Sequence, residues 1–231
     1  MLMERESRAL SGFRVITGGL NEALRHADRS DDPVATQALL RGLYGRGLYG
    51  VVFAGIEVYL TTLGKDLAVD WIIRERSSGS RSLSRYNDLV CGLGARRSRV
   101  AKIATSRSSA EIFELVHADF TAVTLNRPVA VDQIIGFHGV TALERQNLWG
   151  RVAQRSSLWG AREAQEGLEL AVERRNSIAH TGDLGAWGNA RPMKSSTVQK
   201  ASVLVESVVL EVEASLTSPP LWAKGDCGDE R

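Results

Sequence analysis

The 231-residue sequence predicts an all-α protein built as a bundle of helices. Apolar residues recur with the 3.6-residue period of an amphipathic helix through most of the chain. Helix start and stop signals separate these periodic segments, as in Ser30-Asp31-Asp32-Pro33, where acidic residues precede a proline. No series of segments shows the two-residue alternation that half-buried strands require.

Two helices are expected in the first third of the chain. Residues 4–28 carry one apolar stripe, which predicts an amphipathic helix. The stripe consists of Leu10, Phe13, Ile16, Leu20 and Leu24. A long apolar segment at about 34–74 predicts a second helix. Glycines in its first half leave open whether this helix bends or splits in two. These are Gly42, Gly45, Gly47 and Gly50.

The remaining chain combines a basic loop with several shorter helices. Residues 75–108 are rich in arginine and serine, and we expect a loop there with a short helix at 95–104. Further helices are expected at 109–124, 130–136, 141–153, 160–180 and 196–216. The last of these is rich in valine, but its apolar spacing favours a buried helix over a strand.

The chain is long enough to bury the core of one domain. We expect an N-terminal helical extension over residues 1–30 and a helical domain over 31–217. Residues 218–231 start with Ser-Pro-Pro and continue with glycine and charged residues, which predicts a flexible tail.

The sequence favours a cytoplasmic protein without metal or cofactor. No segment approaches about 18 uninterrupted apolar residues, so no membrane span is expected. The N-terminus lacks the basic start and apolar run of a signal peptide. Cys91 and Cys227 form no CxxC pair, which argues against a disulfide framework or a zinc site. His26, His117 and His138 are dispersed without ligand spacing, and no phosphate-binding glycine loop occurs.

The net charge of +2 is unevenly distributed. The segment from Arg74 to Arg107 contains nine arginine or lysine residues and only two acidic residues. Arginine's planar fork suits phosphate oxygens and base stacking. Either this stretch contacts RNA, or it is a solvent-exposed segment that only connects the neighbouring helices. If it contacts RNA, the candidate residues are Arg96, Arg97, Arg99 and Lys102.

The most informative segment is Glu173–His180, near the end of the helix expected at 160–180. At 100° per residue, Arg175 falls in the middle of the helix's apolar stripe, so its guanidinium should face the core or an interface. Burying an unpaired cation costs several kcal/mol, which indicates a partner or a function. Asn176 and His180 are four residues apart and share the neighbouring face. The alternative is a structural ion pair for Arg175 and a helix-capping role for His180.

The pattern Arg175-Asn176-x-x-x-His180 resembles the RNxxxH motif of HEPN ribonucleases. A second segment, Phe53–Leu60, is similar to the early-helix pattern of some HEPN subgroups, in which an apolar residue precedes Glu-x-Tyr. The resemblance implies a helical bundle of the HEPN type, here with additional short helices and a basic loop. It also implies a homodimer in which two motifs form one composite site.

The chemistry expected from these residues is metal-independent cleavage of RNA by attack of its 2′-OH. His180 is the candidate general base or acid, and Arg175 the candidate clamp for the phosphate oxygens. Asn176 can orient a phosphate oxygen or the histidine. Two copies would supply both an acid and a base. The products would be a 2′,3′-cyclic phosphate and a 5′-hydroxyl.

Additional RNA contacts are expected from Arg174 and from Trp187, whose glycine-rich loop follows the motif. The other tryptophans are interpreted as core or interface anchors, namely Trp71, Trp149, Trp159 and Trp222. The resemblance implies a toxin or antiviral-defence effector controlled by a protein partner, with tRNA as one plausible substrate. Two other functions remain open: a non-catalytic helical module that binds RNA or protein, and a dimeric scaffold in which Arg175 is purely structural.

Overall fold

The computed structural model describes residues 7–18, 34–79, 82–94, 99–106, 108–183 and 191–216, with the backbone alone at 34–41. Within these ranges all regular structure is helical, which confirms the prediction of an all-α protein. The helices are α1 (Arg8–Thr17), α3 (Val34–Ser77), α4 (Ser84–Gly92), α5 (Val100–Thr105), α6 (Ser109–Phe120), α7 (Pro128–His138), α8 (Ala142–Arg155), α9 (Ala161–Thr181) and α10 (Ser195–Ser215).

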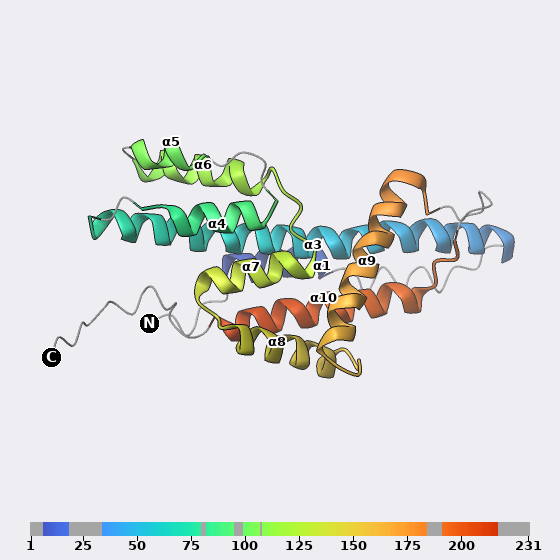
Figure 1. Ribbon diagram of the computed structural model, residues 1–231. Helices are drawn as coiled ribbons and strands as arrows, with labels where there is room; N and C mark the ends of the chain where they lie inside the picture. The colour runs from blue at the N-terminus through green and yellow to red at the C-terminus, as the bar shows by residue number, and fades with distance from the viewer. Residues whose placement is uncertain are drawn as a thin grey trace.

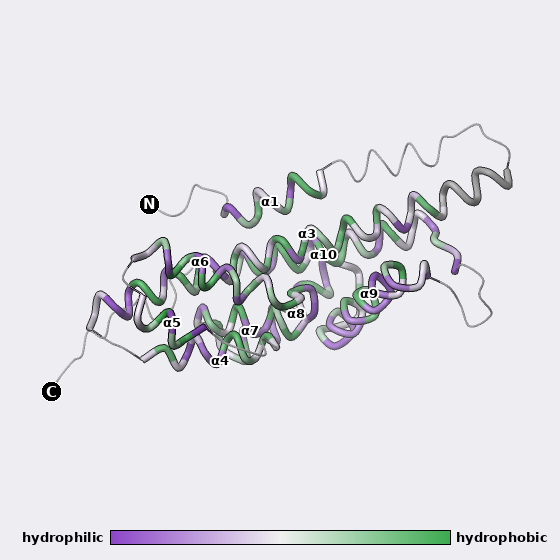
Figure 2. Tube along the Cα trace, turned by 90° about the horizontal axis from the view of Figure 1, so that it is seen from above, coloured by the Kyte–Doolittle hydropathy of each residue, from purple (hydrophilic) through white to green (hydrophobic). Residues whose placement is uncertain are grey.

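The 44-residue helix α3 runs through the whole molecule, and the other helices pack along it (Figure 1). α1 and α9 lie on opposite sides of α3, and α9 crosses it obliquely (Figures 1 and 2). α10 runs beside α3 and also packs against α8. Much of the surface of α3 is therefore covered by its neighbours.

The glycines of α3 do not split it, because the helix continues without interruption from Val34 to Ser77. Some of them permit close approach instead. A Cβ atom built on Gly45 would lie 2.6 Å from Cγ of Met193, and one on Gly64 would overlap the ring of Phe120. The two glycines therefore let the segment before α10 and the end of α6 pack tightly on α3.

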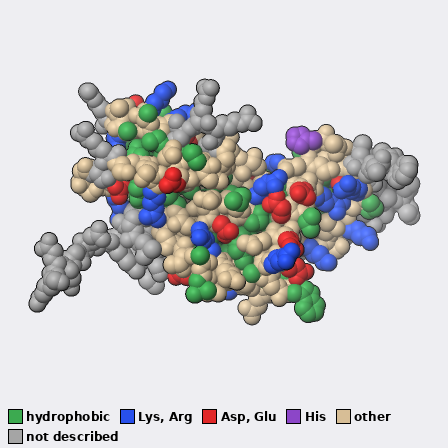
Figure 3. Space-filling model, viewed as in Figure 1, with side chains coloured by type: hydrophobic (Ala, Val, Ile, Leu, Met, Phe, Trp, Pro, Cys, Tyr) green, Lys and Arg blue, Asp and Glu red, His purple; other side chains and the backbone are tan. Residues whose placement is uncertain are grey.

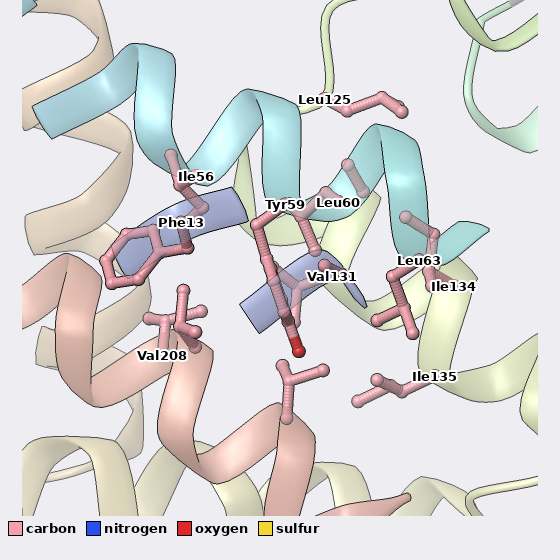
Figure 4. Packing of buried hydrophobic residues seen from close by; sticks show 14 of the residues in the cluster. Phe13, Ile56, Tyr59, Leu60, Leu63, Leu125, Val131, Ile134, Ile135 and Val208 are labelled. Carbon is pink, nitrogen blue, oxygen red and sulfur yellow. The ribbon is translucent and has the colours of Figure 1, made fainter. Parts of the chain in front are cut away.

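Apolar side chains from α1, α3, α7 and α10 meet in a continuous core (Figure 4). Phe13 of α1 packs edge-on against Tyr59 of α3, with ring centroids 6.4 Å apart. Val131 and Ile134 of α7 and Val208 of α10 are fully buried in the same cluster. Because α1 shares this core, residues 8–17 pack with the rest of the helices.

Five helices follow the expected periodic segments closely. These are α6, α7, α8, α9 and α10, which correspond to the segments expected at 109–124, 130–136, 141–153, 160–180 and 196–216. α8 begins with a capping box, in which Thr141 and Glu144 satisfy each other's backbone N–H groups. The valine-rich α10 buries Val205, Val208, Val209 and Val212, so helix was the correct interpretation.

The basic stretch, residues 75–108, is more helical than expected. It contains α4, which was not expected, and α5, which begins later than the short helix expected at 95–104. α4 forms because Tyr86, Leu89 and Val90 bury one face of it. This three-residue apolar pattern was obscured by the arginines and serines around it.

Parts of two expected segments lie outside the described residues. The helix expected over 4–28 is described as α1, which ends at Thr17, and residues 19–33 are not described. The tail expected at 218–231 is also outside the described ranges. In the described chain, the helical residues Gly42–Ser77 are long and apolar enough to cross a membrane, but half of that apolar window is buried inside the protein.

Candidate functional site at the end of helix α9

The motif residues lie on the last two turns of α9, where the helix leaves the core. The first turns of α9 bury Ala164, Leu168 and Val172 against the bundle. Beyond Val172 the contact with the core loosens, and Ala179 and His180 are exposed. Figure 1 shows this end of α9 projecting past α3. Ile178 still packs partly buried against the core, so the contact with the core weakens gradually and is lost at Ala179.

Arg175 lies between α9 and α3 and is partly buried. Its Nη2 atom donates to Glu57 Oε2 at 3.5 Å, and its Nη1 atom donates to Asn176 Oδ1 at 3.2 Å. The side chains of Arg175 and Glu57 are each 29% exposed. The guanidinium thus has a carboxylate partner at the edge of the core and remains accessible to solvent.

This contact joins the two segments that carry the family resemblance. Glu57 is the glutamate of the Glu-x-Tyr pattern on α3, and Arg175 is the arginine of the motif on α9. Tyr49, two turns before Glu57, strengthens the same helix pairing, because its hydroxyl donates to the carbonyl oxygen of Ala171 at 3.1 Å. Burial raises the pKa of Tyr49 to about 12, and Asp183 adds to the rise, while Arg174 opposes it.

His180 is exposed on the last turn of α9. In the described part of the chain no hydrogen bond or ion pair joins it to Arg175, Asn176 or any other residue. The space-filling view shows a histidine exposed on the same face as several basic and acidic side chains (Figure 3). Among the residues that the structure describes, the imidazole therefore has solvent as its surroundings and no bonded partner.

The chain leaving α9 is held by a buried carboxylate. Asp183 is fully buried, and its Oδ2 atom accepts a hydrogen bond from Arg174 at 3.1 Å. Arg46 of α3 approaches the same atom at 3.8 Å. Asp183 has a φ of 60°, which an aspartate tolerates better than most residues, and follows the left-handed cap at Gly182.

The two arginines of this cluster also bind the segment before α10. Arg174 donates to the carbonyl oxygen of Pro192 at 2.9 Å, and Arg46 donates to that of Arg191 at 2.7 Å. The cluster of Arg46, Arg174 and Asp183 therefore ties together α3, the end of α9 and the start of α10. Arg174, expected to bind RNA, has its charge compensated by Asp183, and an RNA contact through it stays a prediction.

Most described arginines of the basic stretch hold the fold together. Arg99 pairs with the buried Asp119, and Arg76 donates to the carbonyl oxygens of Ile103 and Ser106. Lys102 is exposed on α5. Arg96, Arg97 and Trp187, which were also expected to contact RNA, lie outside the described residues.

The structure does not bring Arg99 and Lys102 to the motif. α5 lies near one end of α3, whereas the end of α9 lies toward the other (Figures 1 and 2). An RNA that touches both regions would have to extend along the bundle. Within the described ranges, no group of three or more side chains has the composition of a metal site.

Sequence reasoning did not identify three residues as members of this site: Glu57, Arg46 and Asp183. A signal existed for Glu57, since it is the one charged residue in the apolar run Val51–Leu60. Asp183 directly follows the glycine that ends α9, where a charged residue is usually solvated. Only the folded chain shows that two arginines enclose it.

Comparison with known proteins yields no relative. No family model matches the chain, and neither the curated proteins nor the solved structures include a match. The resemblance to HEPN ribonucleases therefore depends on the sequence motif alone.

Proposed function

We propose that this protein is a HEPN-type endoribonuclease that cleaves RNA without a metal ion. The observation that carries the proposal is the arrangement at the end of α9. Arg175 is held at the protein's edge by Glu57 and Asn176, and an unpaired His180 follows about one and a half turns later. An arginine fork can bind a phosphodiester, and an imidazole can take the proton of its 2′-OH.

The arginine is available to a phosphate because its present contact is weak. A 3.5 Å separation is at the long limit for a hydrogen bond, and a partly exposed ion pair contributes at most about 1 kcal/mol. A phosphate oxygen can therefore compete with Glu57 for the guanidinium. In this position Arg175 would stabilise the charge that develops on the phosphorus oxygens.

His180 would move the protons of the reaction. Its imidazole takes the proton from the 2′-OH as the 2′-oxygen forms a bond to phosphorus. The bond from phosphorus to the 5′-oxygen breaks, and that oxygen needs a proton in turn. Each chain has one such histidine, so a second copy related by a two-fold axis would supply the acid. The products are a 2′,3′-cyclic phosphate and a 5′-hydroxyl.

A chain that cleaves cellular RNA would harm its host, so we further propose a cytoplasmic toxin or defence effector that a partner protein controls. Its substrate would include structured RNA such as tRNA. The experiment is incubation of total RNA with the protein in EDTA, with His180→Ala as the matched variant. We expect cleavage by the wild type and at least a roughly 100-fold lower rate for the variant. Equal RNA patterns with and without the wild type would exclude the nuclease.

The second candidate is a non-catalytic helical module that binds RNA or a protein. It is favoured by the ion pair between Arg175 and Glu57, which gives the arginine a structural partner, and by the lack of a bond that orients His180. This candidate predicts that the wild type and His180→Ala bind RNA equally and that neither cleaves it.

A further inference from the structure

The segment before α10 carries two exposed cations, Arg191 and Lys194, beside the end of α9. The backbone N–H of Arg191 donates to the carbonyl oxygen of Asp183 at 2.8 Å. Asp183 follows His180 by three positions, so this bond places Arg191 next to the end of the helix that carries the motif. Figure 1 shows the segment before α10 and the last turns of α9 toward the same end of α3.

The backbone of this segment is held in place while its two cationic side chains are exposed. The carbonyl oxygens of Arg191 and Pro192 accept hydrogen bonds at 2.7 and 2.9 Å from the two arginines of the cluster at the end of α9. Met193 is only 7% exposed and packs against Gly45 of α3. Arg191 and Lys194 lie on either side of this anchor and are both exposed. The two charges are therefore presented to solvent from a fixed piece of chain.

The acidic residues nearby leave these two cations without compensation. Glu57 and Asp183 are already paired with arginines. Glu173 is the remaining acidic residue in the last three turns of α9, and it is exposed. In the described part of the chain, neither Arg191 nor Lys194 has an ion pair or a side-chain hydrogen bond. This part of the surface is therefore net positive and suits an anionic ligand.

We propose that Arg191 and Lys194 bind phosphates of the RNA strand where it passes the end of α9. The inference rests on the proposed function, because it takes RNA as the ligand of the neighbouring motif. Exposed cations bind the phosphates of a nucleic acid by displacing the counterions condensed on it. Three residues of chain span at most roughly 11 Å, so the two side chains can reach phosphates of one short stretch of strand.

The two cations would position the substrate and take no part in the chemistry. Contacts to phosphates fix where a strand lies but do not read its sequence. Arg191 and Lys194 would therefore hold RNA of any sequence, while Arg175 and His180 act on the phosphodiester that is cleaved. An acidic peptide is the other polyanion that such a surface could bind, and the experiment includes it.

The test is the affinity for a short single-stranded RNA, measured over a series of salt concentrations with protein that carries His180→Ala to prevent cleavage. We expect Arg191→Gln and Lys194→Gln each to weaken binding about two- to tenfold at low salt. Each should also reduce the slope of log affinity against log salt by about 0.7, the value for one phosphate contact on a single strand. Lys102→Gln is the matched control and should change neither quantity, because Lys102 is exposed on α5, toward the other end of α3.

Thermal unfolding shows that each variant folds, and it should be unchanged. The hydrogen bonds of Arg191 involve only its backbone, and the side chain of Lys194 is exposed. The substitutions therefore remove charge without removing a contact that holds the segment.

Three results would overturn the proposal. In the first, neither substitution changes the affinity or the slope. In the second, Lys102→Gln weakens binding as much as Lys194→Gln, which would assign the RNA to the basic stretch. In the third, a polyglutamate peptide binds as tightly as the RNA and loses the same affinity in both variants, which would make this surface a docking site for an acidic protein.

Cleavage of RNA by the protein with His180 intact separates this proposal from the nuclease. Cleavage together with unchanged binding in the two variants would remove the phosphate contacts and keep the nuclease. The expected losses of binding without any cleavage would remove the nuclease and keep the RNA surface. If both proposals hold, Arg191→Gln and Lys194→Gln should raise KM for cleavage more than they lower kcat.

Discussion

Glu57 of α3 and Arg175 of α9 face each other across the two helices, with 3.5 Å between Oε2 and Nη2. The residues are 118 positions apart in the chain, yet they belong to the two segments that resemble HEPN ribonucleases. The pair is partly exposed, so its contribution to stability is small. Its main consequence is to hold the guanidinium of Arg175 between α9 and α3 at the edge of the core.

Arg175→Lys should separate the charge of this residue from its shape. Lysine keeps the cation but loses the planar fork that binds two phosphate oxygens. We expect RNA cleavage to slow by about 100-fold, the scale for losing one donor to a developing oxyanion, while unfolding free energy changes by less than about 1 kcal/mol. Initial rates and urea denaturation measure the two effects. Unchanged cleavage would contradict a phosphate-binding role, and loss of folding would favour a structural one.

Asp183→Asn should destabilise the protein much more than a surface charge substitution. The change removes the buried charge that compensates Arg46 and Arg174. Breaking one partner of a buried pair costs about 3–5 kcal/mol, and the partial exposure of the arginines favours the lower end. Asp66→Asn is the control, because its pair with Arg8 is exposed and should cost under about 1 kcal/mol. Equal losses in urea denaturation would show that the cluster does not hold the end of α9.

Glu211 should make stability depend on pH. Burial alone would raise the pKa of its carboxyl group, but hydrogen bonds and charge from Arg151 and Arg155 outweigh burial and hold that pKa below its usual range. A lowered folded-state pKa stabilises the protein above the unfolded-state pKa, and this stabilisation is lost as the pH falls through the folded-state value. Glu211→Gln should therefore cost about 1–3 kcal/mol at neutral pH and much less at an acidic pH below the folded-state pKa, where the Glu211 carboxyl group is protonated.

Urea denaturation of both proteins at the two pH values checks this prediction. The difference between wild type and Glu211→Gln must shrink on acidification. A difference that stays constant with pH would mean that packing of Glu211 between α10 and α8, and not its charge, is what the substitution removes.

Gly64→Ala and Gly47→Ala should have opposite effects, although both replace a glycine inside α3. A Cβ at Gly64 would overlap the Phe120 ring, whereas one at Gly47 meets no atom within 4 Å. We expect Gly64→Ala to cost about 1–3 kcal/mol through overpacking, and Gly47→Ala to gain about 0.5–1 kcal/mol from helix propensity. Thermal unfolding measures both. Equal effects would contradict a packing role for Gly64.

The sequence predicts the all-α class and the later helices well, because apolar residues recur in amphipathic helices with a period of about 3.6 residues. α9 and α10 illustrate this, since the buried residues of α9 repeat every four positions and those of α10 every three or four. The continuity of α3 was not predictable from glycine content, because Gly45 permits a contact with Met193, which is distant in the chain. α4 was missed since three apolar residues among arginines give little periodic signal.

The candidate site was predictable only in part. The spacing of Arg175, Asn176 and His180 placed them at the end of a helix, and the structure has them there. The spacing of apolar residues does not indicate which helices pack together, so the pairing of Arg175 with Glu57 could not be derived from the sequence. The burial of Asp183 likewise depends on a chain reversal that brings Arg46 and Arg174 to it.

Mapping the ends of the RNA fragments produced in EDTA gives the sharpest test of the proposed nuclease. We expect 2′,3′-cyclic phosphate and 5′-hydroxyl ends from the wild type, none from His180→Ala, and no cleavage where the nucleotide before the cut carries 2′-deoxyribose. Fragments with 5′-phosphate ends, or cleavage that needs a divalent ion, would contradict it.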